Sequence, residues 1–327
     1  MIVITGGAGF IGSVLAWKLN ALSHHDLLLV DQDARKPTSG GKWENAKKRR
    51  FEIYLESGDF IQQLEKNAFR GKITAVFHLG ACSDTTQMDT AFLRSNNSEY
   101  SERLASWCLA NKVYFCYASS AATYGDGALG FSDDDKLTPK LKPLNPYGQS
   151  KLDFDNWVLR KSLQDEVVGL RYFNVYGPNE YHKGHMRSLV HKGFEQVMKE
   201  GKLRLFKSYR PEYPDGGQKR DFIYVKDAVE AMIWLYKNPK VKGIFNLGTG
   251  HAQTWNDLAQ ALFDACKKKT VIEYIDMPDN IKNQYQYFTE ADMTKLRKAG
   301  CNTKFRPLDK AVKDYVQNHL LKQDPYL

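Results

Sequence analysis

The chain has 327 residues, 42% of them hydrophobic, 26% charged and with a formal net charge of +9, so it can bury a large core. No apolar run approaches the roughly 20 residues that span a membrane, and the first predicted strand begins at residue 2, so we expect neither a membrane anchor nor a signal peptide. Five cysteines without metal-ligand spacing argue against a metal site and for the reducing cytoplasm, and basic residues spread along the chain favour phosphorylated small ligands over nucleic acid.

The first predicted element is a short apolar strand at 2–5, followed by a glycine-rich turn and a helix at 13–22. Gly7, Gly9 and Gly12 give the pattern Gly-x-Gly-x-x-Gly. This pattern lets a chain turn tightly, bring its backbone against a pyrophosphate and aim a helix N-terminus at the negative charge. Because the turn lies between a strand and a helix, it predicts a dinucleotide-binding site.

A second strand is predicted at 27–31 and ends in Asp31, 19 residues after Gly12. An acid at this place holds a ribose hydroxyl, which favours NAD. The segment 32–50 that follows is polar and basic, and it is either a solvated loop or a source of cations that pair with a 2′-phosphate and select NADP. Its cations are Arg35, Lys36, Lys42, Lys47, Lys48, Arg49 and Arg50.

Further strands and a helix are predicted downstream. Residues 51–59 form an edge strand, and residues 73–81 form a buried parallel strand whose small residues let a cofactor pass closely. His78 lies within this apolar strand, so we interpret it as a hydrogen-bonded core histidine rather than a catalyst. A long helix is predicted at 88–111.

The next strand, at 113–120, ends in two hydroxyl groups, Ser119 and Ser120. The carboxyl ends of strands line the ligand crevice of a doubly wound sheet, so both serines are expected to point toward the chemistry. Prolines just before Tyr147 predict the start of a helix, which places Tyr147 and Lys151 on one helical face. A fixed ammonium beside a phenol favours the phenolate, so this pair is predicted to transfer protons near neutral pH.

Together these features resemble the extended short-chain dehydrogenase/reductase family, and in particular its sugar-nucleotide epimerases, from residue 1 to about residue 309. The resemblance is carried by residues 5–12, 80–83, 117–125, 171–178, 182–184, 219–222 and 245–250. The Gly-Ala-Cys-Ser and His-Lys-Gly elements among them are typical of enzymes that act on an ADP-heptose. The chain departs from the family pattern at 209–217, which looks like an insertion, and the histidine after His-Lys-Gly is shifted, with His191 and Lys192 as candidates.

The resemblance implies an activity. It implies epimerisation at C6 of ADP-D-glycero-D-manno-heptose through hydride transfer to bound NADP and a 6-keto intermediate, a step that supplies the inner core of bacterial lipopolysaccharide. Tyr147 and Lys183 then each exchange protons on one face of the sugar. Ser120 hydrogen-bonds the reacting oxygen, and Lys151 holds the nicotinamide ribose. The other interpretations of Lys183 are a phosphate anchor and a solvated loop lysine.

The resemblance also implies two sets of ligand contacts. The cofactor is NADP in preference to NAD, tightly bound and recycled. Its contacts are Gly6, Gly9, Phe10, Ile11, Gly12, Asp31, Gln32, Leu79, Gly80, Ala81, Cys82, Ser83, Asn96, Tyr147 and Lys151. Those of the ADP-heptose substrate are Ser120, Asn174, Val175, Lys183, His185, Lys192, Phe206, Arg220 and Tyr285. Arg220 is expected to grip the diphosphate.

The predicted fold class is α/β, a doubly wound parallel Rossmann sheet with a smaller, interleaved α/β substrate lobe. Residues 1–175 are assigned to the nucleotide-binding domain, to which 221–250 return, and residues 176–220 and 251–327 to the substrate-binding lobe. The strands expected to rejoin the main sheet are 222–224 and 243–247. The helices at 91–109 and 152–163 have apolar faces that either pair between the subunits of a homo-oligomer or pack within the chain.

Competing functions differ in a few residues. A sugar-nucleotide 4,6-dehydratase needs an acid pair after the strand-end hydroxyl, where this chain has Ala121 and Ala122. A UDP-hexose 4-epimerase uses the same serine, tyrosine and lysine but no second base, so Lys183 discriminates. A non-catalytic nucleotide-binding relative keeps the fold without needing the tyrosine and the lysine, and both are present here.

Overall fold

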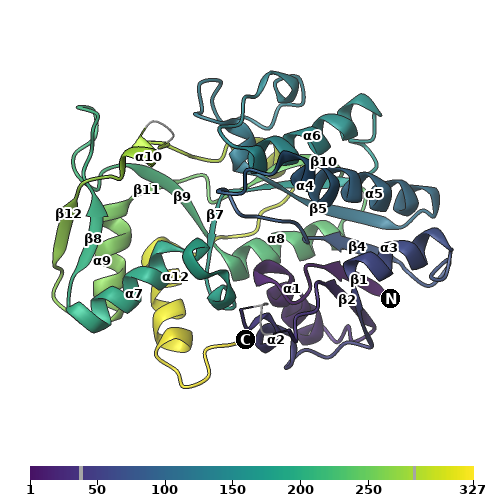
Figure 1. Cartoon of the computed structure of the whole chain (residues 1–327), viewed down its shortest axis with the longest axis horizontal. Coiled ribbons are helices and arrows are strands. Elements are labelled where there is room, and N and C mark those ends of the chain that lie inside the picture. Colours follow the sequence, from purple (N-terminus) through teal and green to yellow (C-terminus); the bar gives the residue numbers. More distant parts are fainter. Residues whose placement is uncertain (37–39, 283–284) are drawn as a thin grey trace.

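The computed structural model of the chain describes residues 1–36, 40–282 and 285–327. Within these residues, seven strands form a central sheet in the order β10-β6-β5-β4-β1-β2-β3, and every neighbouring pair is parallel (Figure 1). The strands are β1 Ile2–Thr5, β2 Leu27–Asp31, β3 Ile53–Glu56, β4 Ala75–His78, β5 Tyr114–Ser120, β6 Val168–Tyr172 and β10 Gly243–Leu247. The chain order reverses between β1 and β4, which is where a doubly wound sheet opens a ligand crevice.

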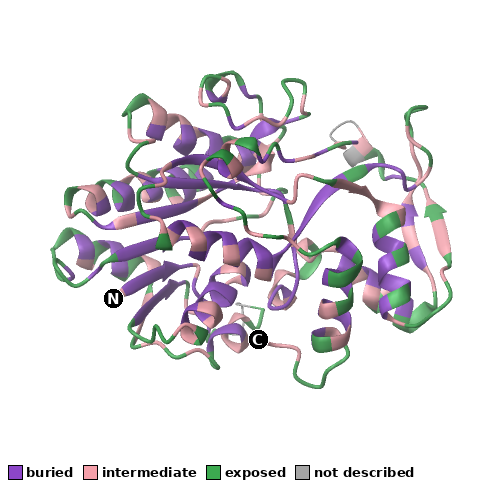
Figure 2. Ribbon diagram, turned by 180° about the vertical axis from the view of Figure 1, so that it is seen from behind, coloured by how far each residue is buried: buried purple, intermediate pink, exposed green. Residues whose placement is uncertain are grey.

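Helices cover both faces of this sheet because successive strand residues point to opposite sides. In β1, Ile2 and Ile4 face one core, and Val3 faces the other. The first core is covered by α1 Phe10–Ala21, α2 Lys42–Ala46, α8 Val225–Lys237 and α11 Thr294–Lys298. The second is covered by α3 Ser57–Glu65, α5 Tyr100–Ala110 and α6 Pro146–Arg160. Figure 2 shows the strands as a buried layer between partly exposed helices.

Two smaller sheets extend from one end of the central sheet (Figure 1). The first has the order β11-β9-β7 and the second pairs β12 with β8. Their strands are β7 Asn174–Tyr176, β8 Leu203–Phe206, β9 Lys219–Tyr224, β11 Ala252–Thr254 and β12 Ile272–Ile275. The helices of this region are η5 Tyr181–Met186, α7 Leu189–Glu200, α9 Trp255–Ala265, α10 Asp279–Lys282, α12 Leu308–Tyr315 and η6 Val316–Leu320. A third core, which includes Leu203, Leu262 and Tyr315, joins them.

The predicted α/β fold with a doubly wound parallel sheet is confirmed, with three differences. Residues 222–224 lie in the three-stranded sheet with β7 and β11, so their assignment to the main sheet is wrong, whereas 243–247 join it as predicted. The first helix begins at Phe10, directly after the glycine turn. The long helix predicted at 88–111 is divided into α4 Thr90–Leu93, the π-helix η2 Arg94–Glu99 and α5. The lobe boundaries remain a prediction.

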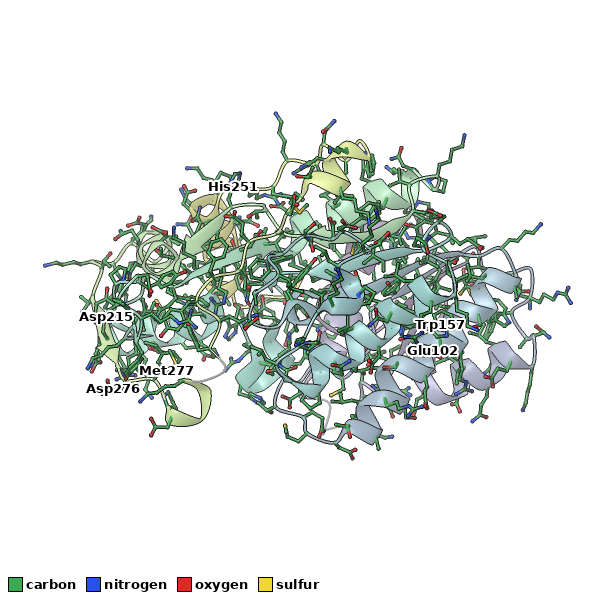
Figure 3. All side chains as sticks on the ribbon, turned by 90° about the horizontal axis from the view of Figure 1, so that it is seen from above. Glu102, Trp157, Asp215, His251, Asp276 and Met277 are labelled. Carbon is green, nitrogen blue, oxygen red and sulfur yellow. The ribbon has the colours of Figure 1, made fainter. Side chains whose placement is uncertain are left out.

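None of the helices among the described residues has the length and apolar character needed to cross a membrane. In Figure 3 the smaller sheets and the helices α5 and α6 lie at opposite ends of the molecule. Asp215 and Asp276 mark the end formed by the smaller sheets, and Glu102 and Trp157 mark α5 and α6 at the other end.

Candidate active site

The glycine turn after β1 is closed so tightly that side chains are excluded. Gly6 has a φ of +66°, and a Cβ there would lie 2.8 Å from the backbone N of Gly80. A Cβ on Gly12 would lie 2.1 Å from the carbonyl oxygen of Gly6. Helix α1 begins after Gly9 with neither a side-chain cap nor an acid in its first turn, so its free amides suit an anion. The turn therefore fits a dinucleotide pyrophosphate.

Asp31 at the end of β2 is buried and points at this turn. Its Oδ2 accepts a hydrogen bond from the backbone N–H of Ala8 at 3.1 Å, and its Oδ1 accepts one from the backbone N–H of Gln32 at 2.8 Å. Lys42 of α2 pairs with the same Oδ1 at 2.6 Å. Asp31 therefore lies beside the glycine turn with a cation next to it, and its contact with a ribose stays a prediction.

Most other cations of the segment 32–50 are directed elsewhere. Arg35 pairs with Asp33, Lys36 with Glu56, Lys47 with Glu44, Lys48 with Asp324, and Arg49 with the carbonyl of Leu327. Residues 37–39 of this segment lie outside the described residues. Of the segment's described cations, Lys42 is the one that pairs with Asp31.

The loop after β4 is held from two sides. The side chain of Thr5 accepts a hydrogen bond from the backbone N–H of Gly80 at 3.0 Å. Asn97 in the π-helix binds Cys82 twice, accepting from its N–H and donating to its carbonyl, both at 2.9 Å. Asn97 also donates to the hydroxyl of Ser150 at 3.0 Å, which joins the predicted cofactor loop to α6.

His78 in β4 is a core histidine, as predicted. Its Nδ1 contacts the hydroxyl of Thr5 at 2.7 Å, and its Nε2 contacts that of Ser101 at 2.8 Å. Burial lowers the pKa of His78 to about 3, so the ring stays neutral and is not available as a base.

Tyr147 lies in the first turn of α6, as the upstream prolines predict. Pro146 is the first helical residue, and the side chain of Asn145 caps the helix by accepting from the N–H of Gly148 at 2.8 Å. Burial raises the pKa of Tyr147, and a hydrogen bond with Ser120 works in the opposite direction. The phenol therefore lies beside the strand-end hydroxyl, as a shared site for a reacting oxygen requires.

Lys151 follows one turn later and is 7% exposed. Its Nζ donates to the carbonyl of Ala118 in β5 at 2.8 Å. Burial lowers its pKa to about 8, while the carboxylate of Asp155 and the thiol of Cys82 work in the opposite direction. Lys151 is therefore fixed on β5. The predicted effect of its ammonium on the phenol is not seen here, because the pKa of Tyr147 is raised by burial and the group that lowers it is Ser120.

The prediction for Ser119 is wrong. Its side chain is buried and donates to Asp155 on α6 at 2.9 Å, away from Ser120. Successive strand residues alternate between the two faces, so two neighbouring hydroxyls at a strand end do not serve the same site.

Lys183 lies against the start of α1. Its Nζ is 5.6 Å from the centre of the Phe10 ring, directly after the glycine turn. Burial lowers the pKa of Lys183, and the Glu180 carboxylate works in the opposite direction. Gly184 follows with a φ of +53°, which turns the chain away. The position beside Phe10 is inconsistent with a solvated loop lysine.

Three predicted substrate residues come together at the smaller sheets. The Arg220 guanidinium lies 5.1 Å from the ring centre of Tyr285 and 5.8 Å from that of Trp255. The ring of Phe206 lies 6.3 Å from that of Tyr285. Arg220 donates to the backbone carbonyls of Lys219 and Gln286. Its side chain is 7% exposed, and this burial lowers the pKa of the guanidinium.

The remaining predicted substrate residues are spread more widely. Asn174 and Val175 lie in β7, and the side chain of Asn174 accepts from Thr289 at 3.5 Å. The side chain of His185 is 68% exposed, and its Nε2 lies 3.8 Å from Oδ1 of Asp84. The ammonium of Lys192 donates to the backbone carbonyl of His185 at 3.3 Å.

Of the two candidates for the shifted family residue, Lys192 is the more available. His191 is buried, packs on Tyr181 and contacts Arg187, and burial lowers its pKa to about 4. Lys192 is only half-buried.

Asn97, Trp255 and Asp155 were not predicted. Asn97 holds the loop after β4 from the π-helix, in which residues 97 and 98 are buried, and no pattern in the sequence reveals a π-turn. Asn96 stays a predicted cofactor contact. Trp255 begins α9 and donates to the hydroxyl of Tyr285 at 2.8 Å, a contact across 30 residues that periodicity cannot indicate. Asp155 lies four residues after Lys151 on the same helical face, and that spacing was the available signal.

In the described part of the chain, no cluster of three or more His, Cys, Asp or Glu side chains is arranged to hold a metal ion.

The chain is similar to known proteins in both sequence and structure. The model of the NAD dependent epimerase/dehydratase family matches residues 2–248. The chain is 50% identical to the ADP-L-glycero-D-manno-heptose-6-epimerase of Nitratidesulfovibrio vulgaris (strain DP4) over 327 residues, 100% of both chains. It is 43% identical to the enzyme of that name from Fusobacterium nucleatum subsp. nucleatum over 338 residues, also 100% of both. The crystal structure of the Helicobacter pylori enzyme of that name superposes with a TM-score of 0.76 at 28% identity, covering 97% of this chain and 95% of that one.

Proposed function

The chain belongs to the NAD dependent epimerase/dehydratase family, and on that premise we propose that it converts ADP-D-glycero-D-manno-heptose to ADP-L-glycero-D-manno-heptose by epimerisation at C6. The observation that carries the proposal is 50% identity over the whole of both chains with a relative of that name. In this reading it supplies a precursor for the inner core of lipopolysaccharide.

The proposed chemistry needs two proton-transferring groups. A bound nicotinamide supplies the hydride acceptor and donor at C6. Tyr147, hydrogen-bonded to Ser120, takes the proton of the C6 hydroxyl as a ketone forms. After the ketone rotates, Lys183 supplies the proton on the opposite face. Support for Lys183 comes from its place against Phe10, where it is partly buried beside the glycine turn.

Ser120, Lys151 and Arg220 hold the reactants in place in this proposal. Ser120 hydrogen-bonds the reacting oxygen, and Lys151 binds the nicotinamide ribose from its position on β5. Arg220, whose guanidinium lies over the rings of Trp255 and Tyr285, grips the diphosphate of the substrate. Hydride returns to the molecule that gave it, so the cofactor is recycled and stays bound.

The cofactor is a nicotinamide dinucleotide, as the family requires, and we propose that it is NADP. The support is the Lys42 ammonium at 2.6 Å from Asp31. Asp31 alone favours a free ribose hydroxyl, whereas the adjacent cation offsets its charge and can pair with a 2′-phosphate. Denaturing the purified protein by heat and measuring the mass of the released dinucleotide identifies it directly, and NAD would contradict the proposal.

We also propose a cytoplasmic homo-oligomer. The five cysteines are free thiols, as expected in a reducing compartment. In this proposal a second copy of the chain packs against α4, α5 and α6. The exposed side chains of Phe92 in α4 and of Leu144, just before α6, lie on or next to these elements. Light scattering of the purified protein tests this, and a monomer at micromolar concentration would contradict it.

The test of the activity compares two substrates. Purified enzyme is incubated with ADP-D-glycero-D-manno-heptose and, separately, with a UDP-hexose, and the products are resolved by chromatography. We expect the L-glycero epimer from the first and no turnover of the second. Turnover of the UDP-hexose alone would instead assign a 4-epimerase, and a bound nicotinamide that turns over neither would point to a non-catalytic relative.

A further inference from the structure

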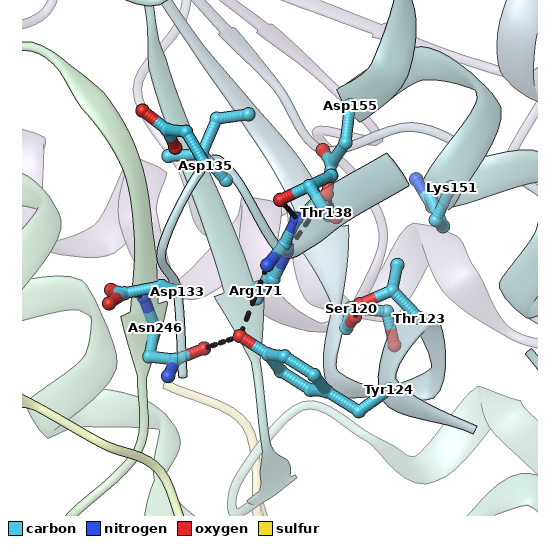
Figure 4. A network of polar contacts seen from close by, with 12 residues as sticks. Ser120, Thr123, Tyr124, Asp133, Asp135, Thr138, Lys151, Asp155, Arg171 and Asn246 are labelled. Carbon is cyan, nitrogen blue, oxygen red and sulfur yellow. Dashed lines mark hydrogen bonds and ion pairs between the residues drawn. The ribbon is translucent and has the colours of Figure 1, made fainter. Parts of the chain in front are cut away.

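A buried carboxylate, Asp155, lies beneath the catalytic helix. It is fully buried on α6, one turn beyond Lys151. Its Oδ1 accepts from the Tyr117 hydroxyl, and its Oδ2 accepts from the Ser119 hydroxyl and from Nε of Arg171, each at 2.9 Å. Figure 4 shows this group beside Lys151 and Ser120.

The partner guanidinium, Arg171 on β6, is fully buried as well. Its Nη1 donates to the Tyr124 hydroxyl at 3.1 Å, and its Nη2 donates to the Thr138 hydroxyl at 2.8 Å. Tyr124 in turn donates to the side chain of Asn246 at 2.6 Å. Removing two charges from water costs about as much as their pairing returns, and apolar residues of similar size often hold a fold equally well. Stability alone therefore does not explain this ion pair.

Its geometry connects it to Lys151. The ammonium of Lys151 donates to the carbonyl of Ala118 at 2.8 Å. Tyr117 and Ser119, the two neighbours of Ala118 in β5, both donate to Asp155. The carboxylate therefore fixes the strand segment on which Lys151 rests.

Among the described residues, several charged or titratable groups face Lys151 or Asp155. His78 and Cys82 face Lys151 from β4 and the loop after it. Tyr117 and Arg171 face Asp155 from β5 and β6. Two more acids lie nearby: Asp133 accepts from the backbone N–H of Asn246, and Asp135 is paired with Lys295.

We propose that Asp155 is a positioning residue that keeps Lys151 charged and fixed at neutral pH. The kinetic part of this inference rests on the proposed function, and the part that concerns the charge does not. Burial alone favours the neutral amine, and a carboxylate one helical turn away favours the ammonium. The ammonium is the form present below the pKa of Lys151, about 8, and it is lost as the pH rises through that value.

The direct test is a titration of Lys151. Protein labelled with ¹³C at the lysine Cε is titrated by NMR, and Lys151→Arg assigns the signal. In Asp155→Asn the midpoint is expected to move to lower pH by about one pH unit or more. Asp155→Glu keeps the charge and is expected to restore most of the wild-type midpoint.

The matched control is Asp227→Asn, which removes another buried carboxylate paired with an arginine, Arg306. It is expected to lower stability and to leave the Lys151 midpoint in place. If Asp155→Asn does not fold, the double variant Asp155→Asn with Arg171→Met leaves no buried charge unpaired, and its Lys151 midpoint is also expected to fall. An unchanged midpoint in the folded variant, or an equal fall in Asp227→Asn, would overturn the inference.

The kinetic arm uses the pH profile of epimerisation. The alkaline limb of kcat is expected to move with the NMR midpoint, since both report the same ammonium. An enzyme inactive on ADP-heptose would remove the proposed function, and the NMR titration would still decide the role of Asp155.

Discussion

The two sides of the site hold their charges differently. On the side of the central sheet, the cation is anchored: Lys151 donates to the Ala118 carbonyl beside the Asp155–Arg171 pair. On the side of the smaller sheets, Arg220 is as deeply buried, yet among the described residues no carboxylate lies within ion-pair distance of it. Its partners are ring faces and backbone carbonyls. The first arrangement holds a cation in a fixed place, whereas the second leaves a cation available to an anionic ligand.

The largest effect is expected at Lys183, which lies beside Phe10 at the start of α1. Lys183→Met should remain folded and lose about 10²- to 10⁴-fold in kcat, because a second proton-transferring group is removed. Steady-state kinetics with ADP-heptose measure this, and circular dichroism checks the fold.

A matched control for this variant is Lys199→Met on the exposed face of α7, which should keep wild-type rates. A rise in KM with unchanged kcat would make Lys183 a phosphate anchor instead, and a fully active variant would remove it from the mechanism.

A smaller effect is expected from Arg220→Gln. A charge-assisted hydrogen bond contributes about 1.5–3 kcal/mol, so KM for the ADP-sugar should rise about tenfold to hundredfold with kcat less affected. The matched control is Arg210→Gln, an exposed guanidinium 4.6 Å from the Tyr287 ring, which should change KM little. Equal effects of the two variants would mean that the buried, acid-free position of Arg220 does not identify it as the diphosphate-binding residue.

The same contrast explains what the sequence could predict. The glycine turn, Asp31, Ser120 and the Tyr147–Lys151 spacing are local patterns whose structure follows from strand and helix periodicity. The third core and the Arg220 cluster are made by contacts between distant segments, such as that of Trp255 with Tyr285. Local periodicity carries no information about such contacts.

One error on the central-sheet side has a local cause. Ser119 and Ser120 end the same strand, and alternation along a strand turns neighbouring side chains to opposite faces, so Ser119 bonds Asp155 instead of facing the site. The strand itself is predicted correctly, and only the facing of Ser119 is wrong. Asn96 stays a predicted cofactor contact, because the bonds of Asn97 are made to the loop itself.

The smallest effect is expected at Lys42. It tests whether the Lys42–Asp31 ion pair selects NADP over NAD. Lys42→Met removes the partner of a buried carboxylate and leaves Asp31 free to accept a ribose hydroxyl. The NADP:NAD ratio released from the purified variant should therefore fall about tenfold, the equivalent of one charge-assisted contact. Lys47→Met is the matched control, because Lys47 closely follows the same short helix but pairs with Glu44. A ratio that falls equally in both variants would attribute cofactor choice to the net charge of the segment, and an unchanged ratio in Lys42→Met would mean that its ammonium serves only to balance Asp31.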